Sequence, residues 1–381
     1  MKRFLLYLLV ACGILTTGCD QDEPTTPSIT LSQNNIEAWF DAGDYSIEIN
    51  ATCAWEATSD SDWVIIANEN GAKGVSELKF SLLQNSSTEV RTAKISISNK
   101  EYNLTEEITI SQAILLDEYF QITYTSKDGK AVEPYTAEAF DAEIESNNYT
   151  NGIGTLRFKT PISKVGEMAF YDCASLKSIT LPNSITEIGG WAFFGCFYLE
   201  EATLSSRLKT IGDVAFSSCS TLSSITLPQS LDYVGDSAFY GCSGMAGYYG
   251  KFASEDNRCL VVGNVLRHFA PKGITQYEIP KDITTIAHDA FYESLRLISV
   301  TIPASVTSIE EYAFYYCENL KNVYCKPTTP PSLGVSVFDN NDGTDKPIGC
   351  KFWVPTASVE AYKSSENWSR YKSYIYGDES L

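Results

Sequence analysis

The sequence predicts a mainly β protein with short helices, in which a β-sandwich is followed by a solenoid of stacked repeats. Three observations support this fold class. Short runs that alternate apolar and polar residues fill residues 29–114, as is typical of antiparallel sheets. Farther along the chain, one motif recurs every 23 residues, and such a spacing indicates a repeat array. The main helical pattern is a short amphipathic stretch at residues 359–368.

The overall composition excludes several classes of function. The chain has 381 residues, of which 44% are hydrophobic, as in globular proteins of two or three domains. Its formal net charge of −20 repels phosphate groups, so nucleic acids and anionic lipid surfaces are poor partners. Two histidines offer little material for histidine-based metal sites or catalytic triads. The sequence has no phosphate-binding loop and no C-x-x-C pair, so we expect no enzyme, no cofactor and no metal.

The first element is a signal sequence at residues 1–18. Lys2 and Arg3 precede an apolar run that is too short for the roughly 20 residues that span a bilayer. Residues 15–19 resemble a bacterial lipobox, in which the thiol of Cys19 receives a diacylglycerol, although Leu15 stands four places before Cys19 instead of three. The alternative is an ordinary cleaved signal in which Cys19 has no role.

A tether at residues 19–27 follows, with acids and prolines and no apolar side chain to pack. Its acidic start after Cys19 resembles the surface-export signal of outer-membrane lipoproteins in gut Gram-negative bacteria. The resemblance implies a lipid-anchored protein on the outer membrane, exposed at the cell surface.

Residues 28–115 predict an antiparallel, immunoglobulin-like β-sandwich. Turn signals such as Asn70-Gly71 separate the alternating runs and leave no room for a helix. We expect one apolar set of side chains to face inward: Ile47, Ile49, Leu78, Phe80, Ile95, Ile97, Ile108 and Ile110.

The same segment resembles the BACON family of immunoglobulin-like modules. The resemblance rests on a signature spread over nearly the whole domain: Trp55, Trp63, Asn85, Arg91, Ser111 and Gln112. BACON modules were proposed to bind carbohydrate, and some are spacers, so the resemblance implies a glycan-binding module or a stalk. Glycan contacts would use the exposed indole faces of Trp39, Trp55 and Trp63. We favour the alternative that these rings fill the sandwich core.

Six copies of the motif I-G-x-x-A-F-x-x-C-x-x-L-x-x-I-T-L-P predict the solenoid. Its phenylalanine recurs every 23 residues and resumes that step after an insertion, at Phe170, Phe193, Phe216, Phe239, Phe291 and Phe314. One such unit cannot bury its own apolar edge, so neighbouring units must stack into continuous interior ladders. The motif closely resembles the BspA-like leucine-rich repeats of bacterial and protozoan surface proteins. This resemblance implies adhesion to, or recognition of, a host or microbial surface protein, glycoprotein or glycan.

We expect the leucine-rich-repeat array to occupy residues 116–335. An atypical capping repeat at about 116–164 begins it, and a C-terminal cap at 336–381 ends it, because solenoids need polar ends. Between Phe239 and Phe291 the spacing is 52 residues, whereas two ordinary repeats take 46. Residues of about 246–272 in this interval resemble the β-hairpin that members of the family insert within the array.

Two rows of residues are the candidate binding surfaces. The strand of each repeat presents an open face lined by Thr180, Thr203, Thr226, Glu278, Thr301 and Tyr324. The residue after each repeat phenylalanine belongs to an aromatic stripe, interrupted by Ser217 and otherwise made of Tyr171, Phe194, Tyr240, Tyr292 and Tyr315. Stacked at one coil spacing, these rings would offer a docking surface for protein or glycan. The alternative is that they seal the outer edge of the solenoid.

The remaining cysteines and histidines predict no special chemistry. One interior slot of the repeat, occupied by Ser294 in one copy, holds five cysteines that we expect to be buried free thiols: Cys173, Cys196, Cys219, Cys242 and Cys317. The sequence leaves open the disulfide state of Cys53, Cys259, Cys325 and Cys350. We interpret His268 in the hairpin and His288 at a variable repeat position as surface residues.

Overall fold

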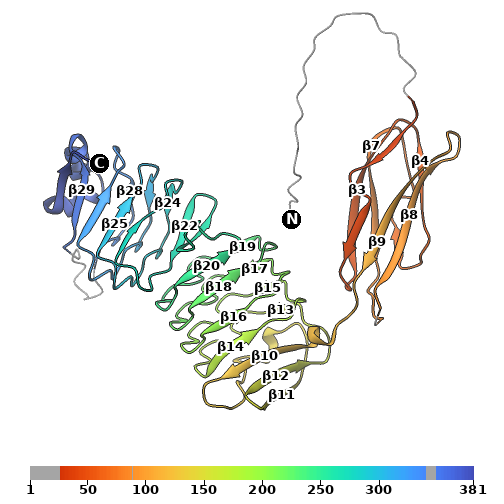
Figure 1. The fold of residues 1–381 in the computed structure, drawn as a ribbon, viewed down its shortest axis with the longest axis horizontal. Helices are drawn as coiled ribbons and strands as arrows, with labels where there is room; N and C mark the ends of the chain where they lie inside the picture. Colours follow the sequence, from red (N-terminus) through yellow and green to blue (C-terminus); the bar gives the residue numbers. More distant parts are fainter. Residues whose placement is uncertain (1–25, 88, 340–348) are drawn as a thin grey trace, which may run out of the picture. The chain divides into compact units, whose positions relative to one another are not determined.

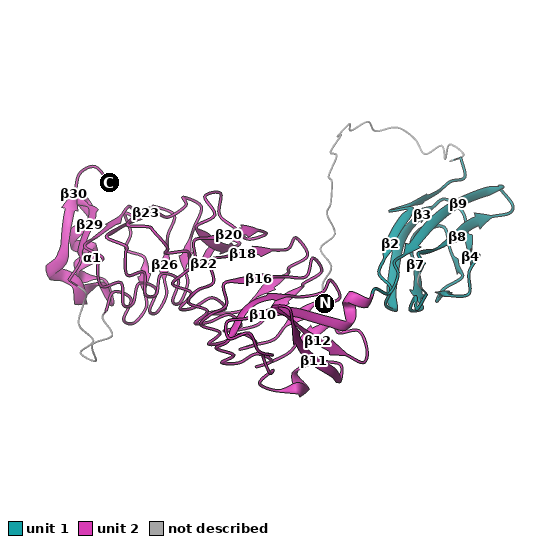
Figure 2. Cartoon of the chain, turned by 60° about the horizontal axis from the view of Figure 1, so that its bottom comes forward, with its two compact units in different colours: residues 1–116 teal, residues 117–381 magenta. Residues whose placement is uncertain are grey.

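The computed structural model describes residues 26–87, 89–339 and 349–381, and the chain divides into two compact units, 1–116 and 117–381 (Figure 1, Figure 2). Cys19 and the signal sequence lie outside the described residues. Both units are mainly β, as predicted. The helices of the described ranges are short: α1 (Val359–Ser364) and the 3₁₀ helices η1 (Asp117–Phe120), η2 (Ala137–Ala139), η3 (Thr356–Ser358) and η4 (Trp368–Tyr374).

The first unit is a β-sandwich. Its strands are β1 (Ile29–Leu31), β2 (Asn35–Ala38), β3 (Gly43–Ala51), β4 (Trp55–Ser59), β5 (Val64–Ile66), β6 (Asn70–Gly71), β7 (Gly74–Leu82), β8 (Arg91–Asn99) and β9 (Leu104–Gln112). One sheet has the order β1-β3-β7-β5 and the other β2-β9-β8-β4-β6. All eight predicted core residues are at most 1% exposed. They are buried because alternate side chains of each strand point toward the opposite sheet.

Four of the six signature residues, Trp63, Asn85, Arg91 and Gln112, contact one another or neighbouring backbone in the part of the sandwich where β8 and β9 pair. The amide Nδ2 of Asn85 donates to the carbonyl oxygen of Ala113 at 2.9 Å. The Nε of Arg91 donates to Oε1 of Gln112 at 2.8 Å, and its guanidinium lies 4.2 Å from the centroid of the Trp63 ring. Because Asn85 and Gln112 are buried, these hydrogen bonds satisfy polar groups that would otherwise be costly to bury. A structural role therefore accounts for these four residues of the signature.

The second unit is a solenoid, and one side of it, the strand face, carries the leucine-rich-repeat strands. The sheets of this face have the orders β11-β12-β10-β14-β16, β18-β20 and β23-β25-β27-β29-β30. The strands are β10 (Gln121–Ser126), β11 (Ile144–Thr150), β12 (Ile153–Phe158), β14 (Leu176–Thr180), β16 (Glu201–Thr203), β18 (Ser224–Leu227), β20 (Gly247–Gly250), β23 (Gln276–Glu278), β25 (Ser299–Ile302), β27 (Asn322–Cys325), β29 (Lys351–Pro355) and β30 (Ile375–Asp378).

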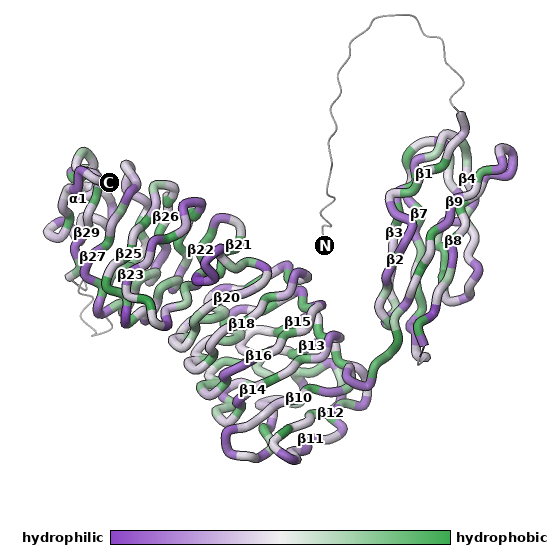
Figure 3. The backbone as a smooth tube through the Cα atoms, viewed as in Figure 1, coloured by the Kyte–Doolittle hydropathy of each residue, from purple (hydrophilic) through white to green (hydrophobic). Residues whose placement is uncertain are grey.

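The other strands of the solenoid form a second side, the back face. The two sheets of this face have the orders β13-β15-β17-β19 and β21-β22-β24-β26-β28. The strands are β13 (Lys164–Val165), β15 (Glu187–Ile188), β17 (Thr210–Ile211), β19 (Tyr233–Val234), β21 (Cys259–Val262), β22 (Val265–Phe269), β24 (Thr285–Ile286), β26 (Ser308–Ile309) and β28 (Ser332–Leu333). Neighbouring coils pair in parallel one repeat apart, as Ile188 does with Ile211. Hydrophobic and hydrophilic positions alternate along the coils (Figure 3).

A ladder of phenylalanine rings fills the centre of the solenoid. Phe216 stacks between Phe193 and Phe239, with ring centroids 4.9 Å and 5.5 Å away. Phe338 stacks on Phe314 at 5.0 Å, and β28 pairs with β26, so the repeat pattern continues past residue 335 into a turn that is a seventh copy of the motif. The prediction missed this turn because Val337 replaces the motif alanine. We call the full row the phenylalanine ladder: Phe140, Phe170, Phe193, Phe216, Phe239, Phe269, Phe291, Phe314 and Phe338.

The five cysteines of the repeat slot are free thiols, and four of them are buried as predicted, whereas Cys173 in the first repeat is half-buried. The four cysteines whose state the sequence left open are free thiols too. The Sγ of Cys196 donates to the carbonyl oxygen of Phe170 at 3.1 Å, and the Sγ of Cys219 donates to that of Phe193 at 3.2 Å. Burial raises the pKa of both thiols. Ser294 occupies the same slot, and its buried Oγ finds no hydrogen-bond partner within the described ranges. The thiol thus links consecutive coils where the shorter hydroxyl does not.

The inserted hairpin separates the solenoid core into two apolar clusters. Strands β21 and β22 are antiparallel, as predicted, and β22 then pairs in parallel with β24. The prediction that His268 is a surface residue is wrong, since this residue is only 7% exposed. Its Nδ1 lies 2.6 Å from the hydroxyl of Tyr248, and burial lowers its pKa to about 3. The side chain points inward because β22 enters the stack of coils, where Phe269 joins the ladder.

No helix in the part of the chain that the structure describes is both long and apolar enough to cross a membrane.

Candidate functional site

The candidate site lies where two rows of repeat positions run side by side along the solenoid. One row is the predicted aromatic stripe. The second, which we call the companion row, stands three residues earlier in each repeat: Met168, Trp191, Val214, Ser237, Asp289 and Tyr312. Both rows lie on the segment that leads from the back face to the strand face, as between β17 and β18.

The companion row has a left-handed backbone in every coil. Val214 has φ of 60°, Trp191 58° and Asp289 58°. This conformation costs most residues about 1–2 kcal/mol relative to a right-handed one, and glycine adopts it most readily. In every coil except that of Ser237, the amide of the row residue donates to a carbonyl of the next coil, as Val214 does to Asp236 at 3.0 Å. No member of the row is glycine, so every coil carries a side chain at this position despite the cost of the backbone conformation.

The aromatic stripe forms stacked, half-buried rings on either side of Ser217. Tyr171 and Phe194 are stacked with centroids 5.1 Å apart and planes within 14° of each other. Beyond the gap, Tyr240 and Tyr292 are 4.3 Å apart. Tyr292 and Tyr315 are 6.0 Å apart. The contact between Tyr240 and Tyr292 shows that the stripe stays continuous across the inserted hairpin.

A groove of about 510 Å³ lies along the two rows at the Ser217 gap. Every residue that lines it belongs to the stripe or to the companion row, except His288. Trp191 is 37% exposed and packs against Phe194 at 4.9 Å, so its indole forms part of one wall. A groove of this size falls in the range of small-molecule sites, about 300–1,000 Å³.

Polar groups stand among these rings. Asp289 is 8% exposed, and its Oδ2 accepts a hydrogen bond from the Oγ of Ser237 at 3.3 Å and lies 2.9 Å from Nε2 of His288. Burial raises the pKa of the Asp289 carboxyl to about 6. Ser217 is fully buried at the gap, and its Oγ has no partner among the described residues. The groove therefore combines aromatic walls with the carboxylate of Asp289 and the imidazole of His288, as binding sites for small polar molecules combine apolar walls with a few polar groups.

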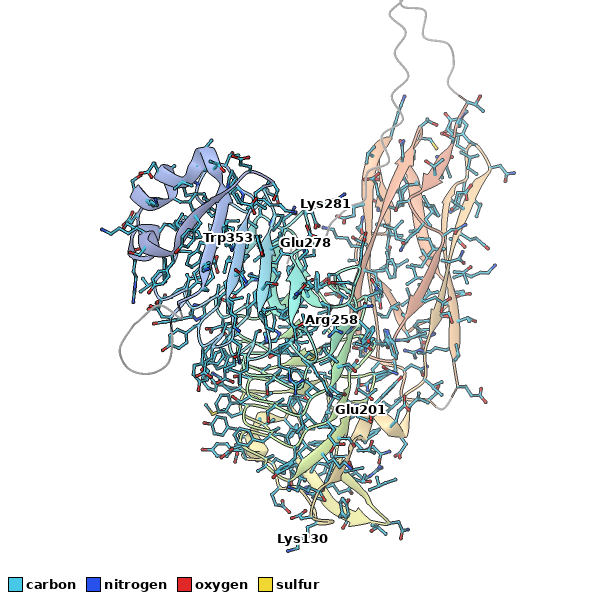
Figure 4. The ribbon with its side chains drawn as sticks, turned by 60° about the vertical axis from the view of Figure 1, so that its left-hand side comes forward. Lys130, Glu201, Arg258, Glu278, Lys281 and Trp353 are labelled. Carbon is cyan, nitrogen blue, oxygen red and sulfur yellow. The ribbon has the colours of Figure 1, made fainter. Side chains whose placement is uncertain are left out.

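The predicted row on the strand face is also aligned by the fold. Thr180 stands in register with Thr203, and Thr226 with Tyr249. After the hairpin, the register continues the row through Glu278, Thr301, Tyr324, Trp353 and Tyr376 (Figure 4). The prediction missed Trp353 and Tyr376, because the repeat motif fades after Val323. This face is the surface of a sheet, with side chains that are exposed or half-buried.

The tryptophans of the sandwich lie mostly in its core. Trp55 and Trp63 are buried, and Nε1 of Trp55 donates to the Oγ of Ser76 at 3.1 Å. A sugar can stack only on an exposed ring face, so core packing, the interpretation that we favoured, is confirmed for these two residues and a glycan contact through them is excluded. Trp39 is half-buried.

The companion row was not predicted, although it repeats with the same spacing as the stripe. Its residue types change from coil to coil, from Trp191 to Ser237 to Asp289, so no shared chemistry marks it in the sequence. His288, predicted to be a surface residue, is exposed and stands beside Asp289. Within residues 26–87, 89–339 and 349–381, no group of three or more His, Cys, Asp or Glu is placed to hold a metal ion.

Both units contain segments that match known protein families. Residues 143–248 and 267–348 match the family described as "BspA type Leucine rich repeat region", in six copies. Residues 54–113 match the BACON family, described as "Putative binding domain, N-terminal". No curated protein matches the chain.

Several solved structures are similar to parts of the chain. A leucine-rich repeat protein of T. pallidum is 28% identical, with a TM-score of 0.30, over 48% of this chain and 71% of that one. A leucine-rich repeat protein from Eubacterium ventriosum is 20% identical, with a TM-score of 0.39, over 51% of this chain and 58% of that one. A Bacteroides ovatus GH5 xyloglucanase is 20% identical, with a TM-score of 0.22, over 24% of this chain. That match spans 21% of the xyloglucanase chain.

Proposed function

Because the chain carries a BACON domain followed by BspA-type leucine-rich repeats, we propose that it is a non-catalytic recognition protein of the cell surface. In this proposal the solenoid binds a partner protein or glycoprotein through the aromatic groove, and the sandwich is a stalk. A lipid at Cys19 attaches the chain to the outer membrane, as the sequence pattern of residues 15–23 implies.

The groove is the observation that supports this role best. It is built from two periodic rows, and it gathers aromatic rings, which contribute most to binding energy when a partner covers them. The companion row retains side chains such as Val214 and Asp289 in a backbone conformation that favours glycine. Side chains retained against this preference are expected where they serve binding and not the core alone.

The strand face is the alternative binding surface of the solenoid. It is a sheet surface on which Thr203 and Glu278 are exposed, whereas the groove is a cavity with buried polar groups. Concave sites bury more of a ligand per contact residue and fix its orientation with few polar groups. We therefore place the partner at the groove.

The test compares full-length variants for binding to immobilised mucin, a glycoprotein surface, by biolayer interferometry. Trp191→Ala removes an exposed ring from the groove wall, and we expect it to weaken binding about tenfold or more. Tyr324→Ala removes a half-buried ring from the strand face, and we expect binding within about twofold of wild type. If Tyr324→Ala abolished binding and Trp191→Ala did not, the partner would bind the strand face instead.

A further inference from the structure

One end of the groove carries a carboxylate oxygen that a guest can reach. Asp289 lines the groove there and is only 8% exposed. Its Oδ2 is already used, by the Oγ of Ser237 at 3.3 Å and by Nε2 of His288 at 2.9 Å. Its Oδ1 accepts no hydrogen bond from any residue that the structure describes, and it keeps surface that solvent can reach. This oxygen is therefore an open hydrogen-bond acceptor in the groove.

Aromatic rings stand around this carboxylate. Tyr292 follows Asp289 by three residues in the same coil, and its ring is tilted against that of Tyr240, with centroids 4.3 Å apart. Tyr312 stands in the next coil, and its ring meets that of His288 edge-on at 5.5 Å. The three tyrosines are half-buried and line the groove. A guest that reaches Oδ1 of Asp289 therefore lies against aromatic rings.

The charge at this end of the groove is negative. Burial raises the pKa of the Asp289 carboxyl to about 6, and the charge of Glu311 adds to that rise. None of the described residues that line the groove is lysine or arginine, and Arg267 of the neighbouring hairpin is paired with Asp236. A positive guest would stabilise the ionised carboxylate, whereas an anionic guest would be repelled.

A guest at this end has to donate to a carboxylate and cover aromatic rings at the same time. An arginine side chain does both, because its guanidinium is planar, has five N–H donors and stacks on aromatic faces. A lysine ammonium is compact and more strongly hydrated, so it loses more hydration among the rings. A sugar hydroxyl donates to Oδ1 but brings no charge to offset those of Asp289 and Glu311. Charge complementarity and the rings together favour arginine.

The opposite end of the groove is apolar. Trp191 lies there, three coil steps from Asp289 by way of Val214 and Ser237, or about 15 Å away. A single side chain is too short to contact both ends. An extended peptide segment of about five residues spans this distance, at about 3.3 Å per residue. The length of the groove thus fits a stretch of protein chain.

We propose that the groove binds an extended segment of a partner protein, whose arginine side chain lies against Tyr292 and Tyr312 and donates to Oδ1 of Asp289. An apolar side chain of the same segment covers Trp191. The inference rests on the proposed function and deepens it, because it names the chemistry of the partner that the groove recognises.

The test measures the binding of synthetic hexa-arginine, hexa-lysine and hexa-citrulline peptides to the full-length chain by calorimetry. Salt at about 0.15 M screens charges that are more than roughly 8 Å apart. We expect hexa-arginine to bind, hexa-lysine to bind severalfold more weakly, and uncharged hexa-citrulline not to bind measurably. Equal binding of the arginine and lysine peptides would overturn the choice of arginine. Binding of hexa-citrulline would overturn the role of charge.

Variants then locate the binding. Asp289→Asn removes the charge and keeps the shape of the side chain, and we expect it to weaken hexa-arginine binding at least about tenfold. Tyr312→Ala removes one ring and should weaken binding about fivefold. The matched control, Asp282→Asn, removes a charge from an exposed position outside the groove and should bind within about twofold of wild type.

Thermal unfolding followed by circular dichroism verifies that each variant is folded. If Asp289→Asn does not fold, Tyr312→Ala tests the same end of the groove. Equal losses of binding in Asp289→Asn and Asp282→Asn would show that the peptide responds to net charge alone, and would refute the inference. Hexa-arginine binding that survives both Asp289→Asn and Tyr312→Ala would refute it as well.

Mucin binding separates the inference from the proposed function. If mucin binding depends on Trp191 but hexa-arginine neither binds nor competes with mucin, the proposed function stands and the inference fails. If hexa-arginine binding depends on Asp289 while Trp191→Ala leaves mucin binding unchanged, the inference stands and the choice of mucin as partner fails.

Discussion

The phenylalanine ladder and the aromatic stripe are one residue apart in every repeat, yet they follow different rules. The ladder keeps phenylalanine in each coil, and from Phe170 to Phe338 its rings are at most 1% exposed. Close packing leaves no freedom at such positions. The stripe is half-buried outside its gap and changes between tyrosine, phenylalanine and serine. The comparison shows that the repeat fixes its inner row by packing and leaves the residue type of its outer row free to vary.

The largest effect should come from breaking the ladder. Phe216→Ala removes a fully buried ring from between two stacked neighbours, and we expect a loss of about 3–5 kcal/mol in the free energy of unfolding. Phe194→Ala, in the half-buried stripe, should lose about 1–2 kcal/mol because it removes less apolar area from water. Urea unfolding followed by circular dichroism measures both. Equal losses would show that the stripe is also core.

The buried histidine of the inserted hairpin, His268, should make stability depend on pH. His268 has a native pKa of about 3 against an ordinary value of 6.5, because burial disfavours its charged form. Between these values the unfolded chain binds more protons, so stability is complete above about pH 6.5 and falls as the pH falls. From this residue alone we expect the free energy of unfolding to fall by about 2 kcal/mol between pH 6.5 and pH 5. Urea unfolding measured at several pH values gives the slope of the free energy of unfolding against pH.

The control for this prediction is His268→Asn, which cannot be protonated in this range. It should be less stable than wild type at pH 7.5 and should lose the part of the slope between pH 6.5 and 5. A slope unchanged by the substitution would mean that His268 takes up its proton in the native state.

The groove should show the opposite dependence. The pKa of Asp289 is raised by burial from 3.8 to about 6, so its contribution to stability is complete below pH 3.8 and is lost as the pH rises through 6. Asp289→Asn should therefore stabilise the chain at pH 7.5, on the order of 1 kcal/mol after allowance for solvent screening, and give no gain at pH 3.5. Thermal unfolding at both values tests this, with exposed Asp282→Asn as the matched control. A loss of stability at pH 7.5 would show that the pair with His288 outweighs burial.

The smallest effect concerns the cysteine slot beside the ladder. Ser294→Cys restores a thiol where the serine hydroxyl is buried without a partner, and its longer side chain can reach a carbonyl of the preceding coil, as Cys317 does with Phe291 at 3.1 Å. We expect a gain of up to about 1 kcal/mol in the free energy of unfolding. Cys219→Ser, the reverse change, should lose a similar amount. A destabilised Ser294→Cys would show that the slot is too small for sulfur in that coil.

The sequence could predict the regular parts of this protein in detail. The 23-residue spacing placed the ladder, the thiol slot and the strand face, because each coil must match the next one along the stack. It also placed the aromatic stripe and its break at Ser217. It could not place His268, since the direction of that side chain depends on how β22 enters the stack. The turn around Phe338 was missed because its motif has changed.

By itself, the sequence determined the fold class, the two architectures and the inner rows of the solenoid, because periodicity and burial are properties of local pattern. Only the tertiary structure decided that Trp55 and Trp63 are core residues and that the stripe adjoins the companion row in a groove. It also brought Ser237 and Asp289, which are 52 residues apart in the chain, into hydrogen-bond contact. The hairpin lies between them in the chain, and only the path of the backbone around it makes their coils neighbours. The chemistry of the groove arises from that proximity.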